Sequence, residues 1–584
     1  MSAVLRSPVS GLPPSRVRLD VRIWAAYLAR APRIIAAIAT LLGLATLAEA
    51  ALPHQRGHVR DVVPVVPVPG SATAAAVVVV SGLLLLRVAS GLRKRKRRAW
   101  QAAVVLTVAM TLAHAFGDER RPVEAAITLV LLALLLAAGS RFTAKPDPRS
   151  RWFAAVVFVQ FAAVSVLYGL ALLYFSRRMI GHPSFTARLQ EVLYALIGAD
   201  GHVQLRGERF GDVFHGTLLG YGLVTVVVVA YLALRPAEPI AHLTLADEQR
   251  LRCLLAKHGH RDSLSYFALR RDKSVVWSPT GKAAITYRVV QGVALASGDP
   301  IGDPEAWPGA MAAFRQLVEE YAWTPAVIGS SEQGATVFKR ECALSALELG
   351  DEAIVDVDDF SLDGRSMRGV RQACTRIARA GYTVQVRRTR DIDATEFAAL
   401  AAAADKWRGE NVERGFSMAL SRLGDLADAD CVLATACQGG ALRGLLHFVP
   451  WGSDGLSLDL MRRDRAADNG LNEFMIEKVL AAGPALGVQR VSLNFAVFRD
   501  ALERGERIGA GPILRCWRAL IVFLSRFWQI ESLYRFNVKF RPYWEPRFLS
   551  YPRVRDIPRI ALAALEAEAF LVRPRLLKRL LLRN

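Results

Sequence analysis

The sequence predicts an α-helical membrane domain of several passes, followed by an α/β (α+β) soluble domain. The apolar excess lies before residue 235, whereas most acidic residues and mixed amphipathic patterns follow it. Apolar stretches in the first part approach the roughly 20 residues that a spanning helix needs. From residue 242 onward, helical periodicity alternates with short strand-like runs. The roughly 340 residues after the apolar part exceed the usual size of one domain, so we expect two soluble subdomains.

Six stretches of the first part are long and apolar enough to predict transmembrane helices. They are residues 34–52, 72–92, 99–117, 123–140, 152–175 and 213–234. The first 33 residues show no short apolar core followed by a small-residue cleavage site, so we expect them to form a basic arm and not a signal peptide.

Basic residues predict the orientation of these spans. They are concentrated in the N-terminal arm, at 93–98 and at 141–151. Six spans place all three groups on one side, which the positive-inside rule makes cytoplasmic. An even number of spans also returns the chain to that side, so the soluble domain is predicted to be cytoplasmic. Residues 176–212 then form the largest external loop.

Few ionisable residues interrupt the predicted spans. Glu49 and Arg87 lie near span ends, where their side chains reach the interface, and His114 lies within a span. His215 is a candidate for lining a lipid or substrate path, because charge inside a membrane often has a function.

The formal net charge of +22 predicts attraction to phosphate, in nucleic acid or in anionic headgroups. Part of that charge serves only to set the topology. All six cysteines lie in the soluble part without a CxxC pair, which favours reduced thiols over disulfides or zinc. His258 and His260 lack a partner carboxylate or cysteine at metal-ligand spacing, so surface or capping roles are favoured and no metal is expected. No cofactor is expected either.

The soluble part contains two similar successions of predicted elements. The first has a helix at 245–258 and strands at 265–269, 274–277, 283–289 and 292–296. The second has helices at 394–407, 417–423 and 472–482, and strands at 431–438, 442–450, 455–461 and 491–494. Helix, antiparallel strands, helix and strand is the order of an N-acetyltransferase-like fold. We therefore expect two such subdomains, at 242–390 and 391–560, with the catalytic site in the second. A basic amphipathic tail at 561–584 is predicted to lie on anionic lipid or in solvent.

Four unusual segments carry a family resemblance. They are 296–303 (ASGDPIGD), 363–368 (DGRSMR), 457–463 with 470–474 (SLDLMRR and GLNEF), and 532–547 (SLYRFNVKFRPYWEPR). Together they resemble the C-terminal catalytic domain of the lysylphosphatidylglycerol synthases, also called multiple peptide resistance factors. The resemblance extends over most of the chain after about residue 245.

The resemblance implies two tandem acetyltransferase-like folds and transfer of an aminoacyl group from aminoacyl-tRNA to phosphatidylglycerol. Lysyl is the favoured aminoacyl group. The product lipid lowers the negative charge of the membrane and thereby weakens the binding of cationic antimicrobial peptides. Aminoacyl-tRNA, phosphatidylglycerol and an anionic membrane are the implied partners, and a homo-oligomer is left open. The membrane region is shorter than in full-length relatives, so flipping of the product lipid is in doubt. We expect another protein to charge the tRNA, because the sequence ends without a synthetase domain.

This chemistry needs a positioned hydroxyl, a proton acceptor and a stabilised oxyanion. Asp459 and Arg462 are predicted to act as a catalytic pair, with Asp459 holding the amino group or taking a proton and Arg462 binding phosphate. A structural ion pair across strands is the alternative. Lys539, the third catalytic candidate, would supply positive charge to the lipid phosphate, the tRNA end or the oxyanion.

Five more residues are candidates for substrate binding. Glu473 is a second carboxylate for the amino group, and Arg547 is a phosphate contact or a structural residue. Asp299 follows a strand in a Gly-Asp-Pro sequence, where turn chemistry is the alternative. Asn494 and Asn537 lie at the end of a predicted strand and within the last motif.

Two other functions remain open. An acyl-CoA-dependent N-acyltransferase would keep the fold, but no glycine-rich loop that opens a helix is evident for the pyrophosphate. A lipid transporter or scaffold would show more polar residues inside the spans. The sequence leaves open the amino acid, among lysine, alanine, arginine and ornithine, and the lipid acceptor, among phosphatidylglycerol, cardiolipin and diacylglycerol.

Overall fold

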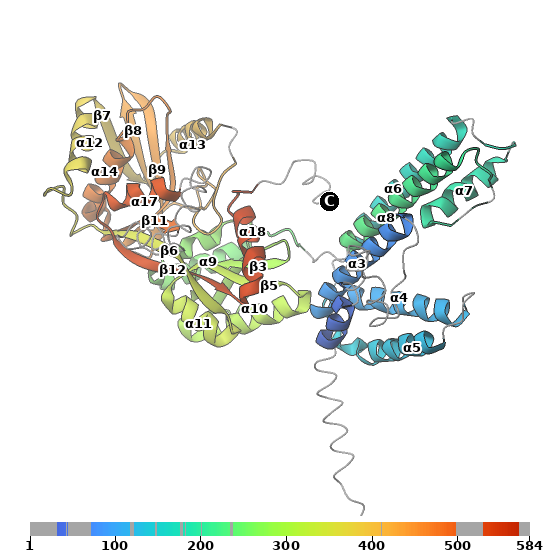
Figure 1. Ribbon diagram of the computed structural model, residues 1–584. Coiled ribbons are helices and arrows are strands. Elements are labelled where there is room, and N and C mark those ends of the chain that lie inside the picture. Colours follow the sequence, from blue (N-terminus) through green and yellow to red (C-terminus); the bar gives the residue numbers. More distant parts are fainter. Residues whose placement is uncertain are drawn as a thin grey trace, which may run out of the picture. The chain divides into compact units, whose positions relative to one another are not determined.

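The computed structural model forms two compact units, residues 1–237 with 320–322 and residues 238–319 with 323–584 (Figure 1). The structure describes residues 32–41, 44, 72–116, 122–145, 149–175, 179–181, 183–199, 201, 203–233, 238–409, 412–497 and 530–571.

The first unit is helical. Five helices lie on predicted spans: α3 (Ala72–Arg93), α4 (Arg97–Phe116), α5 (Pro122–Ala137), α6 (Arg149–Phe175) and α8 (Glu208–Ala233). The predicted span at 34–52 begins on the helix Pro32–Leu41, and residues 45–52 lie outside the described residues. Among the described helices, Ala154–Phe175 and Phe210–Ala233 are long and apolar enough to cross a membrane.

The region predicted as the largest external loop, 176–212, contains a further helix, α7 (Phe185–Ile197). Ser184 caps its first turn by accepting a hydrogen bond from the Ala187 amide, and Gly198 ends it in the left-handed conformation. Its buried face packs against α6 and α8, and the cluster comprises Leu173, Val192, Ala195, Phe214 and Leu218. A 13-residue helix is too short to span a bilayer, so its pattern does not stand out as a span.

The second unit is built on one mixed sheet. Its strands run in the order β1-β2-β3-β5-β12-β6-β11-β10-β9-β8-β7, with β4 paired to β2. The bounds are β1 (Ser274–Trp277), β2 (Ala283–Val290), β3 (Val293–Ser297), β4 (Ile301–Gly302), β5 (Thr324–Ser330), β6 (Ser345–Asp356), β7 (Tyr382–Arg388), β8 (Val432–Gln438), β9 (Ala441–Trp451), β10 (Gly455–Arg463), β11 (Arg490–Val497) and β12 (Tyr543–Tyr551). The predicted strands at 274–277, 283–289, 292–296, 431–438, 442–450, 455–461 and 491–494 are confirmed within a few residues.

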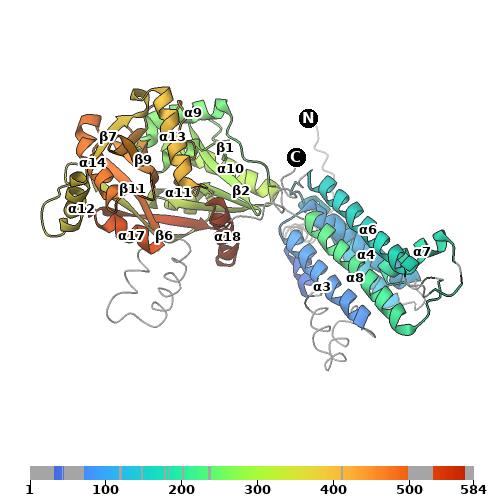
Figure 2. The same ribbon diagram turned by 90° about the horizontal axis from the view of Figure 1, so that it is seen from above.

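Two strands join the halves of this sheet. The strand β12, from near the end of the chain, pairs antiparallel with β5 on one side and with β6 on the other. In turn, β6 also pairs antiparallel with β11. Parallel pairing joins β3 to β5 in one half and β10 to β11 in the other. The halves are therefore continuous through β12 and β6, which Figure 1 labels side by side, and Figure 2 shows β6 of the same sheet from above.

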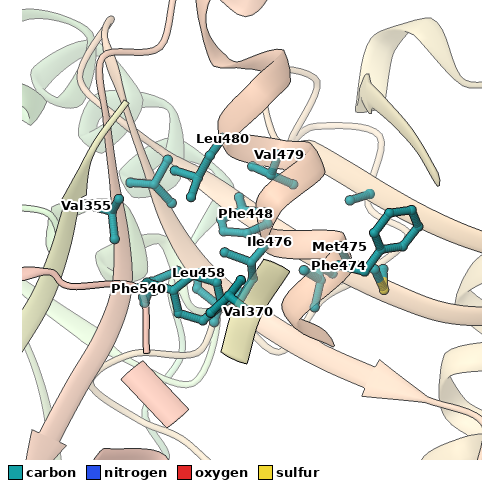
Figure 3. Close-up of a cluster of buried hydrophobic side chains, with 14 of the residues drawn as sticks. Val355, Val370, Phe448, Leu458, Phe474, Met475, Ile476, Val479, Leu480 and Phe540 are labelled. Carbon is teal, nitrogen blue, oxygen red and sulfur yellow. The ribbon is translucent and has the colours of Figure 1, made fainter. Parts of the chain in front are cut away.

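The helices α12 (Arg368–Arg379) and α14 (Leu471–Leu486) cover one face of the second half. Figure 3 shows Val370 of α12 and Val479 of α14 meeting Phe448 and Leu458 of the sheet. Each such side chain contributes about 1.5–3 kcal/mol when fully buried. On the opposite face, α13 (Ala394–Arg408) packs through Phe397 and Leu400.

The remaining described α-helices of this unit are α9 (Leu245–His258), α10 (Trp307–Tyr321), α11 (Glu332–Cys342), α17 (Ile530–Val538) and α18 (Ile557–Ala567). In α18, Ile560 and Ala563 are buried against Val293 and Leu549. Residues 561–567, predicted as part of a basic tail, therefore belong to the folded unit. The tail after Leu571 lies outside the described residues.

Two predicted elements are wrong. Residues 265–269 form a 3₁₀ helix, not a strand, and all five are buried, so no alternation of burial marks the segment. Residues 417–423 form no helix. Their backbone is held from elsewhere, because Ser417 N donates to Glu568 and Leu420 N donates to Asp459.

Candidate active site

The strands β10 and β11 diverge near the middle of the second half. They pair in parallel from Gly455 to Ser457, after which the registers of both strands against their other neighbours shift. Asn494 occupies the irregular part of β11 with φ at 78°, in the left-handed region. Its side-chain Nδ2 donates to the Leu458 carbonyl of β10 at 3.3 Å. This predicted site residue therefore bridges the two strands where they separate.

Glu473 and Lys539 meet beside this region. Glu473 lies in the first turn of α14, which begins after Gly470, and Lys539 follows the last residue of α17. Lys539 Nζ lies 2.8 Å from Glu473 Oε1, and the two side chains are 48% and 13% exposed. A carboxylate that is largely buried next to an accessible ammonium group suits recognition of charged substrate groups.

Asn537 lies on the buried side of α17 and anchors that helix to the sheet. The residue is 1% exposed, and its Nδ2 donates to the Leu493 carbonyl of β11 at 3.4 Å. Its Oδ1 is buried and has no hydrogen-bond partner among the described residues. The structure thus brings Asn494, Asn537, Glu473 and Lys539 to neighbouring parts of β11, α14 and α17.

Asp459 and Arg462 do not form the predicted pair. Asp459 is 5% exposed in its side chain, and its Oδ2 lies 2.7 Å from His447 Nδ1. Its Oδ1 accepts from Leu420 N at 2.6 Å. Arg462 instead binds Glu413 at 3.0 Å and the Ala404 carbonyl at 3.0 Å. The shift in β10 between Leu458 and Leu460 sends the two side chains to different partners.

His447 is a polar residue that the sequence reasoning missed. Burial opposes its charge, yet Cys431 and Asp459 together raise the pKa of His447 to about 10. The residue interrupts the apolar run from Leu445 to Val449 in strand β9, and a polar residue inside such a run is the signal that could have found it. Asp459 and His447 form a buried dyad that holds the 412–423 segment against β10.

Arg547 lies in a buried ionic network and not at an accessible site. It is 2% exposed, and its guanidinium contacts Asp262 Oδ1 at 2.7 Å and Ser263 Oγ at 2.7 Å. Its Nε donates to Glu352 at 2.8 Å, which links β12 to β6. The protein uses these N–H groups itself, so the geometry matches the structural alternative and not the predicted phosphate contact. Sequence reasoning missed the partners, which lie far away in the chain.

Asp299 borders the same network. Its amide donates to Asp262 at 3.1 Å, and its carboxylate accepts from Ser331 N at 2.9 Å and Ser331 Oγ at 2.5 Å. Burial, together with the nearby Asp262 charge, raises the pKa of Asp299 to about 7. The carboxylate thus caps α11 through Ser331 and is 8% exposed.

Two predicted membrane residues have partners in the helical unit. His215 Nε2 lies 3.2 Å from Glu191 Oε1 of α7, and Glu191 also accepts from Val203 N at 3.0 Å. The Arg87 guanidinium lies 5.0 Å from the centre of the Tyr231 ring. Glu49 lies outside the described residues, and of His114 only its position in α4 is described.

The second unit is an α/β domain with a carboxylate–lysine pair beside diverging parallel strands, and it follows an apolar helical unit in the chain. Residues 252–551 match the family described as "Phosphatidylglycerol lysyltransferase, C-terminal". The chain belongs to this family.

Curated relatives extend the similarity into the first unit. The chain is 43% identical over 503 residues to the lysylphosphatidylglycerol biosynthesis bifunctional protein LysX of Rhodococcus opacus, covering 84% of this chain and 44% of that protein. It is 44% identical over 505 residues to the protein of the same name from Mycolicibacterium vanbaalenii, covering 84% of this chain and 45% of that protein. The chain therefore spans less than half the length of these relatives.

Among solved structures, L-PGS from Bacillus licheniformis is 21% identical with a TM-score of 0.48. The match covers 57% of this chain and 99% of that chain.

Proposed function

We propose that this protein is a membrane-bound aminoacyltransferase that moves a lysyl group from aminoacyl-tRNA to phosphatidylglycerol. One observation carries the proposal: the family match at 252–551 contains every residue predicted to be catalytic or to bind substrate in the soluble part, including Glu473 and Lys539. The relatives are named for lysylphosphatidylglycerol biosynthesis, which supports the same acceptor and amino acid.

The reaction is an exchange of one ester for another. The ester bond between the lysyl carbonyl and a ribose oxygen of the tRNA breaks, and a new ester bond forms with a glycerol hydroxyl oxygen. The hydroxyl proton goes to the departing ribose oxygen. Because no bond of a different kind is made, the chemistry needs positioning, proton movement and charge stabilisation and no cofactor.

The pair of Glu473 and Lys539 offers these functions. The two side chains neutralise each other at 2.8 Å. We assign to Glu473 the binding of the substrate α-ammonium group, which replaces Lys539 there. Lys539, nearly half exposed, is then free to stabilise the oxyanion or to contact a phosphate. Asn494 and Asn537 position β11 and α17 around the pair. Asp459 supports the site by holding the 412–423 segment through Leu420.

The proposed fold is two tandem N-acetyltransferase-like units. The element order supports it: α9, β1 to β3, α10 and β5 in one half correspond to α13, β8 to β10, α14 and β11 in the other. Each half ends this series with a parallel strand pair. Two apolar helices of the first unit, together with the other helices on predicted spans, support a multi-pass anchor in the cell membrane. Cytoplasmic placement of the second unit would give it access to tRNA.

A transfer assay with defined donors tests the proposal. The full chain is placed in nanodiscs that contain phosphatidylglycerol and is given labelled lysyl-tRNA. We expect label in the lipid, and none in nanodiscs of phosphatidylcholine alone. Acetyl-CoA tests the competing acyltransferase, and we expect no acetylated product from it. Folded protein that leaves the lipid unlabelled, or that accepts acetyl-CoA instead, would contradict the proposal.

A further inference from the structure

The helix α12 presents two opposite faces. Val370, Ala373, Cys374 and Ile377 are buried in the core of the second half. Arg368, Arg371, Arg376 and Arg379 are exposed, and together they are called the arginine face here. At about 100° per residue these four arginines fall on one side of the helix, and between the first and last the axis rises roughly 16 Å. The helix itself contains no acidic residue.

Arg368 and Arg379 lie at the two ends of the arginine face. Within the described part of the chain, their guanidinium groups make no hydrogen bond or ion pair, so they are available to a ligand. Arg371 donates to the Leu362 carbonyl, and Arg376 donates to the Asn469 carbonyl at 2.7 Å. These bonds to neutral carbonyls orient two of the guanidinium groups without neutralising them. Exposed carboxylates, Asp358, Asp359 and Asp363, lie in the loop before the helix.

The arginine face is continuous with the candidate active site. Figure 1 shows α12 beside α14, and the two helices pack against each other. Arg376 Nη2 reaches the start of α14, where a Cβ added at Gly470 would lie 3.0 Å from it. Glu473 follows in the first turn of that helix. A ligand that reaches Glu473 and extends over α12 would therefore meet the arginines in succession.

The chemistry of the face fits a polyanion better than a bilayer. Helices that lie on a membrane insert an apolar face, and the apolar face of α12 is already buried in the protein. A single phosphatidylglycerol carries one phosphate, whereas these arginines extend over roughly 16 Å of helix. Arginine binds phosphate oxygens through its planar fork, and several such contacts neutralise a nucleic-acid backbone.

We propose that the arginine face of α12 binds the phosphate backbone of the donor RNA and directs its aminoacylated end toward Glu473 and Lys539. The inference rests on the proposed function for the identity of the RNA. The arginine face is then a docking surface next to the reaction site, and its residues take no part in the chemistry.

The test measures RNA binding separately from transfer. The full chain in nanodiscs of neutral lipid is titrated with fluorescent uncharged tRNA at several salt concentrations. The variant R368Q/R379Q removes two charges from the arginine face. The control K339Q/R340Q removes two exposed charges from α11. Thermal melting of each variant establishes that it is folded.

We expect R368Q/R379Q to weaken tRNA binding by roughly 10- to 30-fold at about 0.15 M salt. Its plot of log affinity against log salt should be shallower by about 1.5, because two phosphate contacts are lost. The control should match the wild type. Equal affinity and slope for R368Q/R379Q and wild type would overturn the proposal. A second result would also overturn the proposal: R368Q/R379Q binds tRNA as the wild type does, but its transfer is weaker in anionic nanodiscs only. That result would assign the arginine face to binding of the bilayer.

Transfer by the wild type separates this inference from the proposed function. If tRNA binding depends on the arginine face while no lipid is labelled, the docking surface stands and the proposed reaction fails. If lipid is labelled and R368Q/R379Q binds tRNA as the wild type does, the reaction stands and the docking surface fails.

Discussion

Glu473 and Lys539 form an ion pair at 2.8 Å although 66 positions separate them in the sequence. The contact joins the first turn of α14 to the residue after α17, beside the divergence of β10 and β11. Because Lys539 is nearly half exposed, solvent screens the pair, and it adds about 0–1 kcal/mol to stability. Its effect on stability is therefore small, and we expect its loss to be visible in transfer and not in folding.

Removal of either member of the pair should impair transfer. For Lys539→Met we expect kcat/KM for lysyl-tRNA to fall roughly 100- to 1,000-fold, the usual effect of removing a group that stabilises an oxyanion. Glu473→Gln should act chiefly on KM, because it weakens binding of the amino group. Lys478→Met removes an exposed charge from α14, the helix of Glu473, and serves as the control. Values of kcat/KM for the Glu473 and Lys539 variants within twofold of the wild-type value would contradict these roles.

Arg547 should be essential for stability. Arg547→Met leaves Glu352 and Asp262 buried without their cation, and breaking such a pair destabilises a protein by about 3–5 kcal/mol. Denaturant unfolding followed by tryptophan fluorescence measures the loss. The exposed Arg553→Gln should change stability by less than about 0.5 kcal/mol. An Arg547→Met protein as stable as wild type would mean that the network does not hold β12 to β6.

Asp299 should make stability depend on pH between about 4 and 7. Its folded pKa, about 7, is above the ordinary value of 3.8, because burial and Asp262 disfavour the charge. The associated stability is fully present below pH 3.8 and is lost as the pH rises through 7. Asp299→Asn keeps the neutral form at every pH. We therefore expect the stability of Asp299→Asn relative to wild type to increase from pH 4 to 7, as measured by urea unfolding. A constant difference would contradict the raised pKa.

Two glycines of α8 should respond differently to a methyl group. A Cβ at Gly222 would lie 2.1 Å from the Leu196 carbonyl oxygen of α7, whereas a Cβ at Gly220 meets nothing within 4 Å. We expect Gly222→Ala to lower the melting temperature of the full chain in detergent, since overpacking destabilises by about 1–3 kcal/mol. Gly220→Ala should leave the melting temperature unchanged or raise it. The same response from both variants would argue against close packing of α7 on α8.

Local signals in the sequence predicted many elements well. The helix at 245–258 matches α9, because Thr244 caps its start and Gly259 follows its end. Strands with regular alternation or clear turns were also predicted. The segments at 265–269 and 417–423 were not, because their conformations depend on burial on all sides and on contacts with Glu568 and Asp459.

The candidate site was predictable as a set of residues but not as a set of contacts. Glu473 and Lys539 were both predicted as site residues because they lie in the family motifs. Their pairing depends on how α17 packs near α14, which no local pattern encodes. The shift in β10 that separates Asp459 from Arg462 is likewise a property of the sheet. Arg547 is charged and lies in a motif, and only the fold reveals that its partners are Asp262, Ser263 and Glu352.

The most direct test of the central claim is lipid mass spectrometry of cells that express the full chain, Lys539→Met, Glu473→Gln or no added protein. The proposed reaction predicts a lysyl-bearing phosphatidylglycerol with the wild-type chain and a strong reduction of it in both variants at equal protein levels. Lipid profiles of cells with folded wild-type protein that match those of cells without it would contradict the account.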